Sequence, residues 1–460
     1  MRQKKWTQEK SDFYKHAFAI ALPIALQNLI AALVSSVDVV MLGYVSQDAL
    51  SASSLANQVP FIMMMAFYGL SSGASVLVAQ YWGKKDGETI EQIMGLAFRF
   101  FMGFSAIFTL AALFFPTQLM MLYTDQPELI RLGSEYLRVV AVSYLLMGFS
   151  NFYLSIMRSM ERVVFSTTVY IISLSVNIFF NAVFIFGLFG APKLGLTGVA
   201  VATVIARAVE VAICLGDNAR QKAIRFRLSR VFGHYRVLTH DFVKIAAPAM
   251  VNDLLWGVGF SMYSVIFGHL GSDAVAANSV AGVVRNLGTV FCFGFANATG
   301  IIVGKAMGKN DLQMAEIYAG RMSWLTFITG ALGGLIIVLL CPVLMATMGR
   351  DLTQTASQYL KVMIFINGYY TIGQGMNTCW IVGCFRAGGD TKFGMILDAL
   401  SMWAWSVPLG FLCAFVFNLP VEWVYFVLCT DEFSKMPIVI YHYKGKKWLK
   451  NITREKSELQ

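Results

Sequence analysis

The sequence predicts an all-α polytopic membrane protein with twelve transmembrane helices in two six-helix lobes related by pseudo-two-fold symmetry. Its 460 residues are 57% hydrophobic and only 13% charged, and the mean hydropathy is +0.62. These values lie outside the range of soluble domains. Apolar stretches of about 20 residues recur along the chain, and each is long enough to cross the hydrocarbon core as a helix.

A repeat within the chain predicts that the two lobes are homologous. Residues 21–86 and 246–311 follow the same pattern, 225 positions apart and without a gap. The matched pairs include Pro23 and Pro248, Gly43 and Gly268, Gly69 and Gly294, and Asp86 and Asp311. Because six spans return the chain to its starting side, the halves are expected to be parallel repeats about an axis along the membrane normal.

The apolar stretches also define the predicted organisation of the chain. Spans are expected at residues 16–42, 54–81, 93–115, 136–157, 164–187, 195–215, 243–268, 280–304, 321–345, 360–383, 393–417 and 420–441. The N-lobe covers residues 1–215, a basic cytoplasmic linker 216–242, the C-lobe 243–441 and a cytoplasmic tail 442–460. Lys and Arg concentrate in alternate loops, so we expect both termini in the cytoplasm and the protein in the inner or plasma membrane.

Composition and motif content argue against several other classes of protein. The net charge of +10 lies in loops between spans, so we expect contact with the bilayer and not with nucleic acid. The seven Cys lie in apolar stretches and are interpreted as small core residues, not disulfides or metal ligands. Neither a nucleophile–base pair nor a phosphate-binding loop is visible, so we expect neither an enzyme nor a resident cofactor.

Six segments carry a family resemblance. They are LPIALQNLIAALVSSVDVVMLG at 22–43, GASVLVAQYWGKKD at 73–86, HLGSDAVAANSVAG at 269–282, ATGIIVGKAMGKND at 298–311, CFRAGGDTK at 384–392 and DEFSK at 431–435. In this order they resemble bacterial members of the multidrug and toxic compound extrusion (MATE) family. The resemblance implies a V-shaped antiporter that exports cationic or amphipathic small molecules in exchange for Na⁺ or H⁺ by alternating access. We expect the protein to be a monomer.

A candidate cation site combines one acid with two amides in the N-lobe. Asp38 lies five residues before Gly43, and Asn177 and Asn181 lie four apart on one face of a helix. Such an oxygen-rich pocket suits Na⁺ as a possible bound metal ion, or Asp38 can accept a proton. The resemblance adds the hydroxyl of Thr203. Many MATE members have Asp in place of Asn181, so we expect weaker Na⁺ binding here; alternatively, Asp38 only hydrogen-bonds neighbouring helices.

Two acids within predicted spans of the C-lobe are further candidates, because a charge inside the bilayer is costly unless it faces a cavity or a partner. Asp253 is expected to bind a cation or the cationic substrate, or else to pair with a nearby amide. Asp398 either shares a site or a proton with Asp253, or balances Arg386 or Lys392 near the membrane surface.

Two amides complete this second candidate site. Gln374 and Asn377 lie three residues apart on the tenth predicted span. Together, Asp253, Asp398, Gln374 and Asn377 are predicted to form a substrate or second cation site.

Other charged residues within spans have simpler interpretations. Arg207 and Glu210 lie three apart on one helix and are expected to neutralise each other. Arg285 is expected to reach the membrane surface by extending its side chain. The DEFSK segment at 431–435 is interpreted as a local charge cluster.

Two prolines are predicted hinges. Pro23 and Pro248 occupy equivalent places a few residues inside the first and seventh spans. A proline there frees a backbone carbonyl and permits a kink. We expect these helices to bend at Pro23 and Pro248 during alternating access.

A second function remains open at this point. The superfamily that contains MATE transporters also includes flippases of lipid-linked precursors or polysaccharides, which have similar lobes. Few cations lie within the predicted spans beyond Arg207 and Arg285, which favours an exporter. A channel is disfavoured because no segment resembles a selectivity filter.

Overall fold

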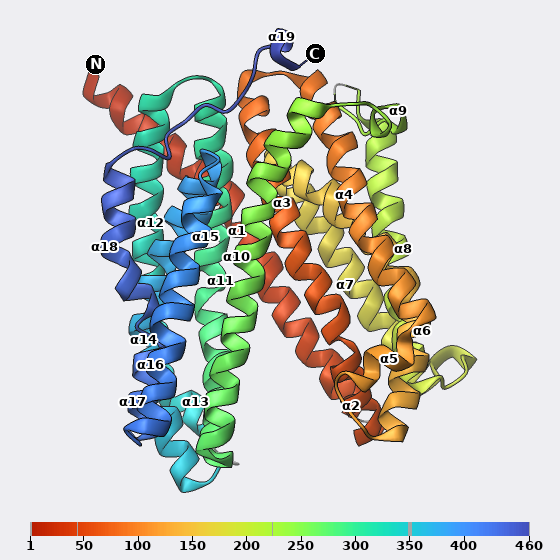
Figure 1. Ribbon diagram of the computed structural model, residues 1–460. Coiled ribbons are helices and arrows are strands. Elements are labelled where there is room, and N and C mark those ends of the chain that lie inside the picture. The colour runs from red at the N-terminus through yellow and green to blue at the C-terminus, as the bar shows by residue number, and fades with distance from the viewer. Residues whose placement is uncertain (1, 44, 223, 348–351, 460) are drawn as a thin grey trace. The chain divides into compact units, whose positions relative to one another are not determined.

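The computed structural model describes the backbone of residues 2–43, 45–222, 224–347 and 352–459 (Figure 1). Side chains are described over the same ranges except at 2–9, 32–40, 43 and 459. Within these ranges the regular elements are helices and there is no β-strand, which confirms the predicted all-α class. The chain divides into an N-unit, residues 27–250 and 454–460, and a C-unit, residues 1–26 and 251–453.

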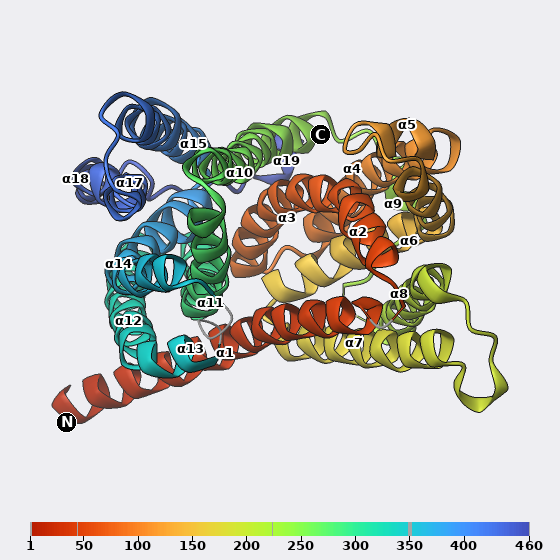
Figure 2. The same ribbon diagram turned by 90° about the horizontal axis from the view of Figure 1, so that it is seen from below.

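The N-unit contains the second part of α1 (Arg2–Gly43) and the first part of α10 (Arg236–Leu270). Between them lie α2 (Gln47–Ala56), α3 (Gln58–Lys84), α4 (Gly87–Phe114), α5 (Pro116–Met121), α6 (Pro127–Ser159), α7 (Val163–Phe186), η1 (Leu188–Gly190), α8 (Gly195–Arg220) and α9 (Leu228–Val231). Helix α6 packs against α4 and α8, and α8 packs against α7 (Figure 2). Aromatic rings fill this interior, with Phe101 5.2 Å from Phe67 and 6.3 Å from Phe152 between ring centroids.

The C-unit contains the first part of α1 and the second part of α10. Its other elements are α11 (Ser272–Gly308), α12 (Leu312–Leu339), α13 (Cys341–Thr347), α14 (Gln354–Thr378), η2 (Cys379–Phe385), α15 (Thr391–Ala399), η3 (Leu400–Ser406), α16 (Val407–Phe411), η4 (Leu412–Val416), α17 (Val421–Leu428) and α18 (Asp431–Lys444). Helices α11, α12 and α14 pack against one another (Figure 2). The elements η2, η3 and η4 are π-helical segments, which often occur near functional sites.

The sequence repeat reappears as a repeat of local structure. Lys85 and Asn310, 225 positions apart, both adopt left-handed backbone conformations, with φ of 63° and 61°. The next residue in each copy caps the following helix: Asp86 accepts from the backbone N–H of Thr89, and Asp311 from that of Met314. The side-chain oxygen satisfies one of the unpaired N–H groups at the helix start. Each copy therefore ends one long helix and begins the next in the same way.

A second equivalent pair explains two glycines of the repeat. Gly69 on α3 packs against the backbone of Met250 on α10, and Gly294 on α11 packs against Ala25 on α1. Ala25 and Met250 are themselves 225 positions apart. A Cβ atom at either glycine would collide with the neighbouring helix, so only glycine allows this close approach. These contacts attach the first part of α10 to the N-unit and the first part of α1 to the C-unit.

Nine helical segments among the described residues are long and apolar enough to cross a membrane. The protein is therefore a multi-pass membrane protein, and the count of twelve spans stays a prediction. The predicted span at 420–441 is broken after Leu428, so α17 and α18 have only 8 and 14 residues. The predicted span at 16–42 includes side chains outside the described residues, and the one at 360–383 carries several buried amides.

The last residues of the chain belong to the N-unit. The guanidinium of Arg454 donates to both carboxylate oxygens of Asp241, at 2.6 and 2.9 Å. Its backbone N–H donates to the hydroxyl of Tyr81 at 3.0 Å. Helix α19 (Lys456–Leu459) follows, and Lys456 lies 2.8 Å from Glu88 at the start of α4. Together with the pair of Glu455 and Lys84 at 3.1 Å, the segment is held by three ion pairs among the described residues, and the sequence does not suggest them.

Candidate functional site

The polar residues predicted on α7 and α8 of the N-unit lie together. The Asn177 amide nitrogen donates to the Thr203 hydroxyl at 3.4 Å, and the Asn181 amide nitrogen donates to the Asn177 amide oxygen at 3.2 Å. Thr203 in turn donates to the carbonyl of Val199 at 2.9 Å. Asn181 is fully buried. The spacing of four residues on α7 and the packing of α7 against α8 produce this cluster.

The fourth predicted member is Asp38, which lies on helix α1 but whose side chain is outside the described residues. The amide and hydroxyl oxygens of Asn177, Asn181 and Thr203 are the kind of ligand that a hard cation prefers. In this structure the Asn177 amide oxygen accepts from the Asn181 amide nitrogen, so a cation bound to that oxygen either shares it with this hydrogen bond or replaces the bond. The donor set fits Na⁺ in chemical type.

Asp253 of the C-unit forms an ion pair. Its Oδ1 lies 2.9 Å from Nη2 of Arg386, which follows the π-helical segment η2. The Arg386 side chain is 7% exposed and that of Asp253 is 21% exposed. The partner of Asp253 is therefore a guanidinium, and not the nearby amide that the sequence left possible.

Asp398 has different partners from those the sequence suggests. Its Oδ1 accepts from the Lys435 ammonium at 2.8 Å, and its Oδ2 accepts from the Asn252 amide at 3.0 Å. The expected balance by Arg386 or Lys392 is wrong: the packing of the helices brings Lys435 of α18 against Asp398, and Arg386 pairs with Asp253. Asp253 and Asp398 therefore form ion pairs with two different basic side chains, Arg386 and Lys435.

The two predicted amides of α14 are buried, and one of them joins the same network. The Asn377 amide nitrogen donates to the backbone carbonyl and the Oε2 of Glu432, at 2.6 and 2.8 Å. Glu432 Oε2 also lies 3.1 Å from the Lys435 ammonium. Gln374 lies one turn before Asn377 and is 4% exposed. A chain of contacts thus runs from Asn377 through Glu432 and Lys435 to Asp398.

Sequence reasoning missed the reach of this network. The DEFSK segment is predicted to form a local charge cluster, and the ion pair of Lys435 with Glu432 confirms one contact within the segment. Lys435, however, also bonds across to α15, a partner 37 positions away. The sequence signal for this network was the pair of adjacent acids Asp431 and Glu432 within a predicted apolar span. In the structure each of them is no more than 2% exposed.

A buried ion pair of the N-unit matches its prediction. Arg207 Nη1 lies 2.6 Å from Glu210 Oε2, which confirms that these residues neutralise each other. Glu210 also accepts from the Ser173 hydroxyl at 3.0 Å. All seven Cys are free and buried, as predicted.

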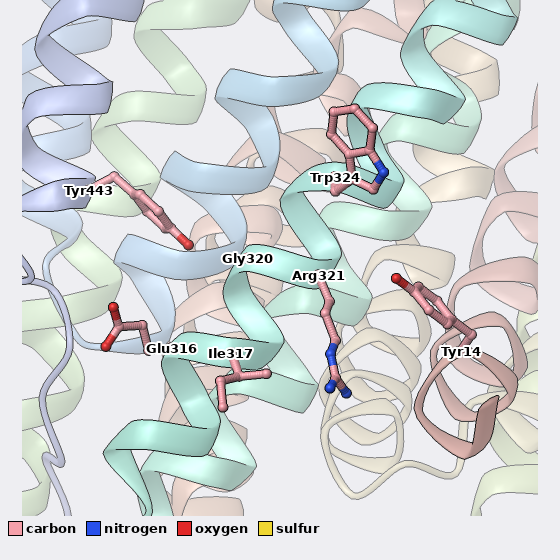
Figure 3. A pocket seen from close by; sticks show the side chains of 7 residues that line it. All are labelled: Tyr14, Glu316, Ile317, Gly320, Arg321, Trp324 and Tyr443. Atoms are coloured by element: carbon pink, nitrogen blue, oxygen red, sulfur yellow. The ribbon is translucent and has the colours of Figure 1, made fainter. Parts of the chain in front are cut away.

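A surface pocket of about 510 Å³ lies in the C-unit, away from these clusters (Figure 3). It is lined by Tyr14, Glu316, Ile317, Gly320, Arg321, Trp324 and Tyr443. Figure 3 shows Tyr443 and Glu316 on one side of α12, and Arg321 and Tyr14 on the other. No predicted site residue lines it. We therefore place the candidate chemistry in the buried polar clusters and not in this pocket.

Comparison with known proteins identifies the relatives of the chain. The MatE family model matches residues 23–183 and 248–412, one stretch in each sequence repeat. The chain is 25% identical over 467 residues to a probable multidrug resistance protein YoeA of Bacillus subtilis (strain 168), covering 97% of each chain. It is 24% identical to a probable multidrug resistance protein NorM of Thermotoga maritima, covering 98% of this chain and 96% of that protein.

Solved structures share the fold. The chain matches a structure described as MATE in the bent conformation with a TM-score of 0.86 at 18% sequence identity, covering 95% of each chain. At this identity the likeness shows the fold alone.

Proposed function

Because the chain belongs to the MatE (multidrug and toxic compound extrusion) family of transporters, we propose that it is a secondary active antiporter that exports organic cations or drugs. The exchanged ion is Na⁺ or H⁺, and the mechanism is alternating access. The observation that carries the proposal is the full-length similarity to relatives named as probable multidrug resistance proteins. The family consists of transporters, so the protein is not an enzyme.

The N-unit cluster supports a coupling site. Asp38 lies on α1, and the bonded group of Asn177, Asn181 and Thr203 supplies neutral oxygens. In this proposal an entering cation neutralises Asp38 and shifts the equilibrium between two conformations. The ion drives transport only if it binds one conformation more tightly than the other.

The C-unit network supports a second site. We assign Asp253, Asp398, Gln374 and Asn377 to the binding of the substrate or of a second cation. Each of the two acids already has a cationic partner, Arg386 or Lys435, so an incoming cation competes with that partner. Such competition is one physical route by which binding can change the packing of helices.

The prolines support a hinge in each long helix. The boundary between the compact units crosses α1 after Leu26, three residues beyond Pro23, and α10 after Met250, two residues beyond Pro248. The two parts of each helix therefore pack in different units. A bend at the proline lets one part move without the other.

The proposed setting follows from the sequence. We assign the protein to the inner or plasma membrane as a monomer, with both termini in the cytoplasm. Its proposed lobes are residues 1–215 and 243–441, joined by the basic linker 216–242 and followed by the tail 442–460. The substrate is a cationic or amphipathic small molecule.

The test uses proteoliposomes loaded with ethidium and an imposed Na⁺ or H⁺ gradient. The expected result is ethidium movement that depends on one of the two gradients, which also names the ion. Parallel vesicles with a fluorescent lipid test the flippase alternative by the loss of fluorescence when a membrane-impermeant reductant is added. Lipid movement without gradient-driven ethidium movement contradicts the exporter.

A further inference from the structure

Helix α18 begins inside the C-unit, at a break in the last predicted span (Figure 1). Helix α17 ends at Leu428, and α18 begins at Asp431. The Leu428 carbonyl accepts from the hydroxyl of Tyr263 at 3.2 Å and from that of Ser406 at 3.1 Å. Side chains thus satisfy backbone groups freed by the break, as a helix interrupted within a membrane requires.

The break places two carboxylates in the first turn of α18. Asp431 and Glu432 are 1% and 2% exposed. The positive end of the helix dipole lies beside them and favours their ionised forms. The dipole thus offsets part of the cost of burying these two adjacent carboxylates.

The charges around this helix start do not balance among the described residues. The carboxylates are Asp398, Asp431 and Glu432, and the nearby cations are Lys435 and Arg285. The guanidinium of Arg285 lies 4.5 Å from the ring centroid of Phe260. The neighbouring Arg386 is engaged by Asp253. The other titratable groups facing Asp431 are Tyr263, Tyr369, Tyr370 and Cys429.

The buried polar atoms near the start of α18 also lack hydrogen-bond donors. Around the start of α18, four buried acceptor atoms have no hydrogen-bond partner among the described residues: Asn252 Oδ1, Gln374 Oε1, Asn377 Oδ1 and Asp431 Oδ1. The orientation of two of the amides follows from their partners, because the nitrogens of Asn252 and Asn377 face carboxylates. The cluster therefore lacks hydrogen-bond donors, and Asn377 is 1% exposed.

We propose that Asp431 is a proton-binding residue, and that the C-unit takes up one proton there during transport. This inference rests on the proposed function and names H⁺ as the ion of this site. Asp398 and Glu432 each accept from the Lys435 ammonium and from an amide, whereas Asp431 Oδ1 has no donor. A proton added to Asp431 gives this donor-poor cluster one more donor and removes the excess negative charge.

The same geometry argues against Na⁺ in this cluster. The Lys435 ammonium already lies between Asp398 and Glu432, at 2.8 and 3.1 Å. A metal cation bound by those carboxylates would face a like charge, whereas a proton forms a neutral acid and avoids the repulsion. Among the described residues no group of His, Cys, Asp or Glu is arranged to hold a metal ion.

The direct test is infrared difference spectroscopy on the full-length protein in lipid, comparing acidic with alkaline pH. We expect a carbonyl band of a protonated carboxylic acid that is lost in Asp431→Asn. The band should persist in Glu210→Gln, which alters a buried carboxylate already paired with Arg207. A band that is unchanged in Asp431→Asn overturns the proposal.

Two further arms keep the test decisive. If Asp431→Asn does not fold, Asp431→Glu retains the acid and should shift the band in frequency; an unshifted band contradicts the assignment. Replacing choline chloride by sodium chloride at constant pH should leave the band in place. Its loss in sodium chloride means that Na⁺ displaces the proton and overturns the choice of H⁺.

A transport readout separates this inference from the proposed function. Ethidium export driven by a pH gradient should lose its dependence on pH in Asp431→Asn, while ethidium binding persists. Unaltered pH dependence in a variant that binds ethidium counts against Asp431. If wild-type vesicles export no ethidium under any gradient, the proposed function fails, whereas the infrared band still reports whether Asp431 binds a proton.

Discussion

The Nη2 atom of Arg386 lies 2.9 Å from the Oδ1 atom of Asp253. This ion pair connects the residue that follows η2 to helix α10. The sequence places the two residues 133 positions apart. The pair has two consequences. It neutralises an acid inside the C-unit, and it ties α10 beyond Pro248 to the loop that follows a π-helical segment.

Removing one member of this pair should destabilise the protein. Asp253→Ala leaves the Arg386 guanidinium, which is 7% exposed, without its carboxylate. We expect a loss of about 1–3 kcal/mol, below the cost for a fully buried pair because Asp253 is partly exposed. The measurement is the Tm of the purified protein in detergent.

The double variant Asp253→Ala, Arg386→Leu serves as the control for that effect. It removes both charges, so much of the lost stability should return. If the double variant is as unstable as the sum of the two single variants, the residues do not interact energetically.

Substitution of Asp38 tests the proposed coupling site. Asp38→Asn removes the negative charge but keeps the size of the side chain, so we expect gradient-driven ethidium export to be lost while the protein level in the membrane is unchanged. Asp48→Asn changes an exposed acid in the first turn of α2 and should export normally. Wild-type export by the Asp38 variant would remove this residue from the mechanism.

A change at Asn181 should alter ion affinity. Asn181→Asp adds a second carboxylate to the cluster with Asn177 and Thr203, so the Na⁺ concentration that gives half-maximal export should fall. Asn181→Leu removes the polar group and should weaken any Na⁺ dependence. Equal Na⁺ dependence in wild type and both variants indicates that no Na⁺ binds beside Asn181.

The hinge proposal predicts a kinetic effect of the prolines. Pro23→Ala and Pro248→Ala restore a backbone N–H and straighten the helix, so ethidium export should slow while membrane insertion is retained. Pro116→Ala is the control, because Pro116 begins α5 and interrupts no helix. Unchanged rates in the variants at positions 23 and 248 contradict a hinge at these residues.

The end of the chain offers a test by proteolysis. Asp241→Asn removes the carboxylate that accepts twice from Arg454, so trypsin should cut after Arg454 and Lys456 faster than in wild type. Asp125→Asn changes an exposed acid and should not alter the rate. Equal cleavage of the Asp241 variant and wild type means that this ion pair does not hold the segment.

The same segment should respond to acid. The Lys456 ammonium lowers the pKa of Glu88 below its usual value. A carboxyl whose pKa is lowered by folding contributes fully above its unfolded pKa, and this contribution is lost as the pH falls through the lowered value. Tail cleavage by an acid-stable protease should therefore accelerate in that acidic range, and Glu88→Gln should remove this acceleration.

The sequence by itself determined the class of fold, the repeat and the local chemistry. Apolar stretches long enough to cross a membrane need only hydropathy and length to be recognised, because in lipid a helix satisfies its own backbone. The pairing of Arg207 with Glu210 and the nearness of Asn177 to Asn181 follow from helical spacing. The repeat placed equivalent helix starts at Asp86 and Asp311.

Only the tertiary structure decided which distant charges meet. Asp398 bonds to Lys435, Asp253 to Arg386 and Arg454 to Asp241, and none of these pairs has a signature in sequence spacing. The break between α17 and α18 also lay hidden within an apolar stretch. The physical reason is that a charge buried among helices is stabilised by whichever group the packing brings within a few ångströms, and packing depends on the whole chain.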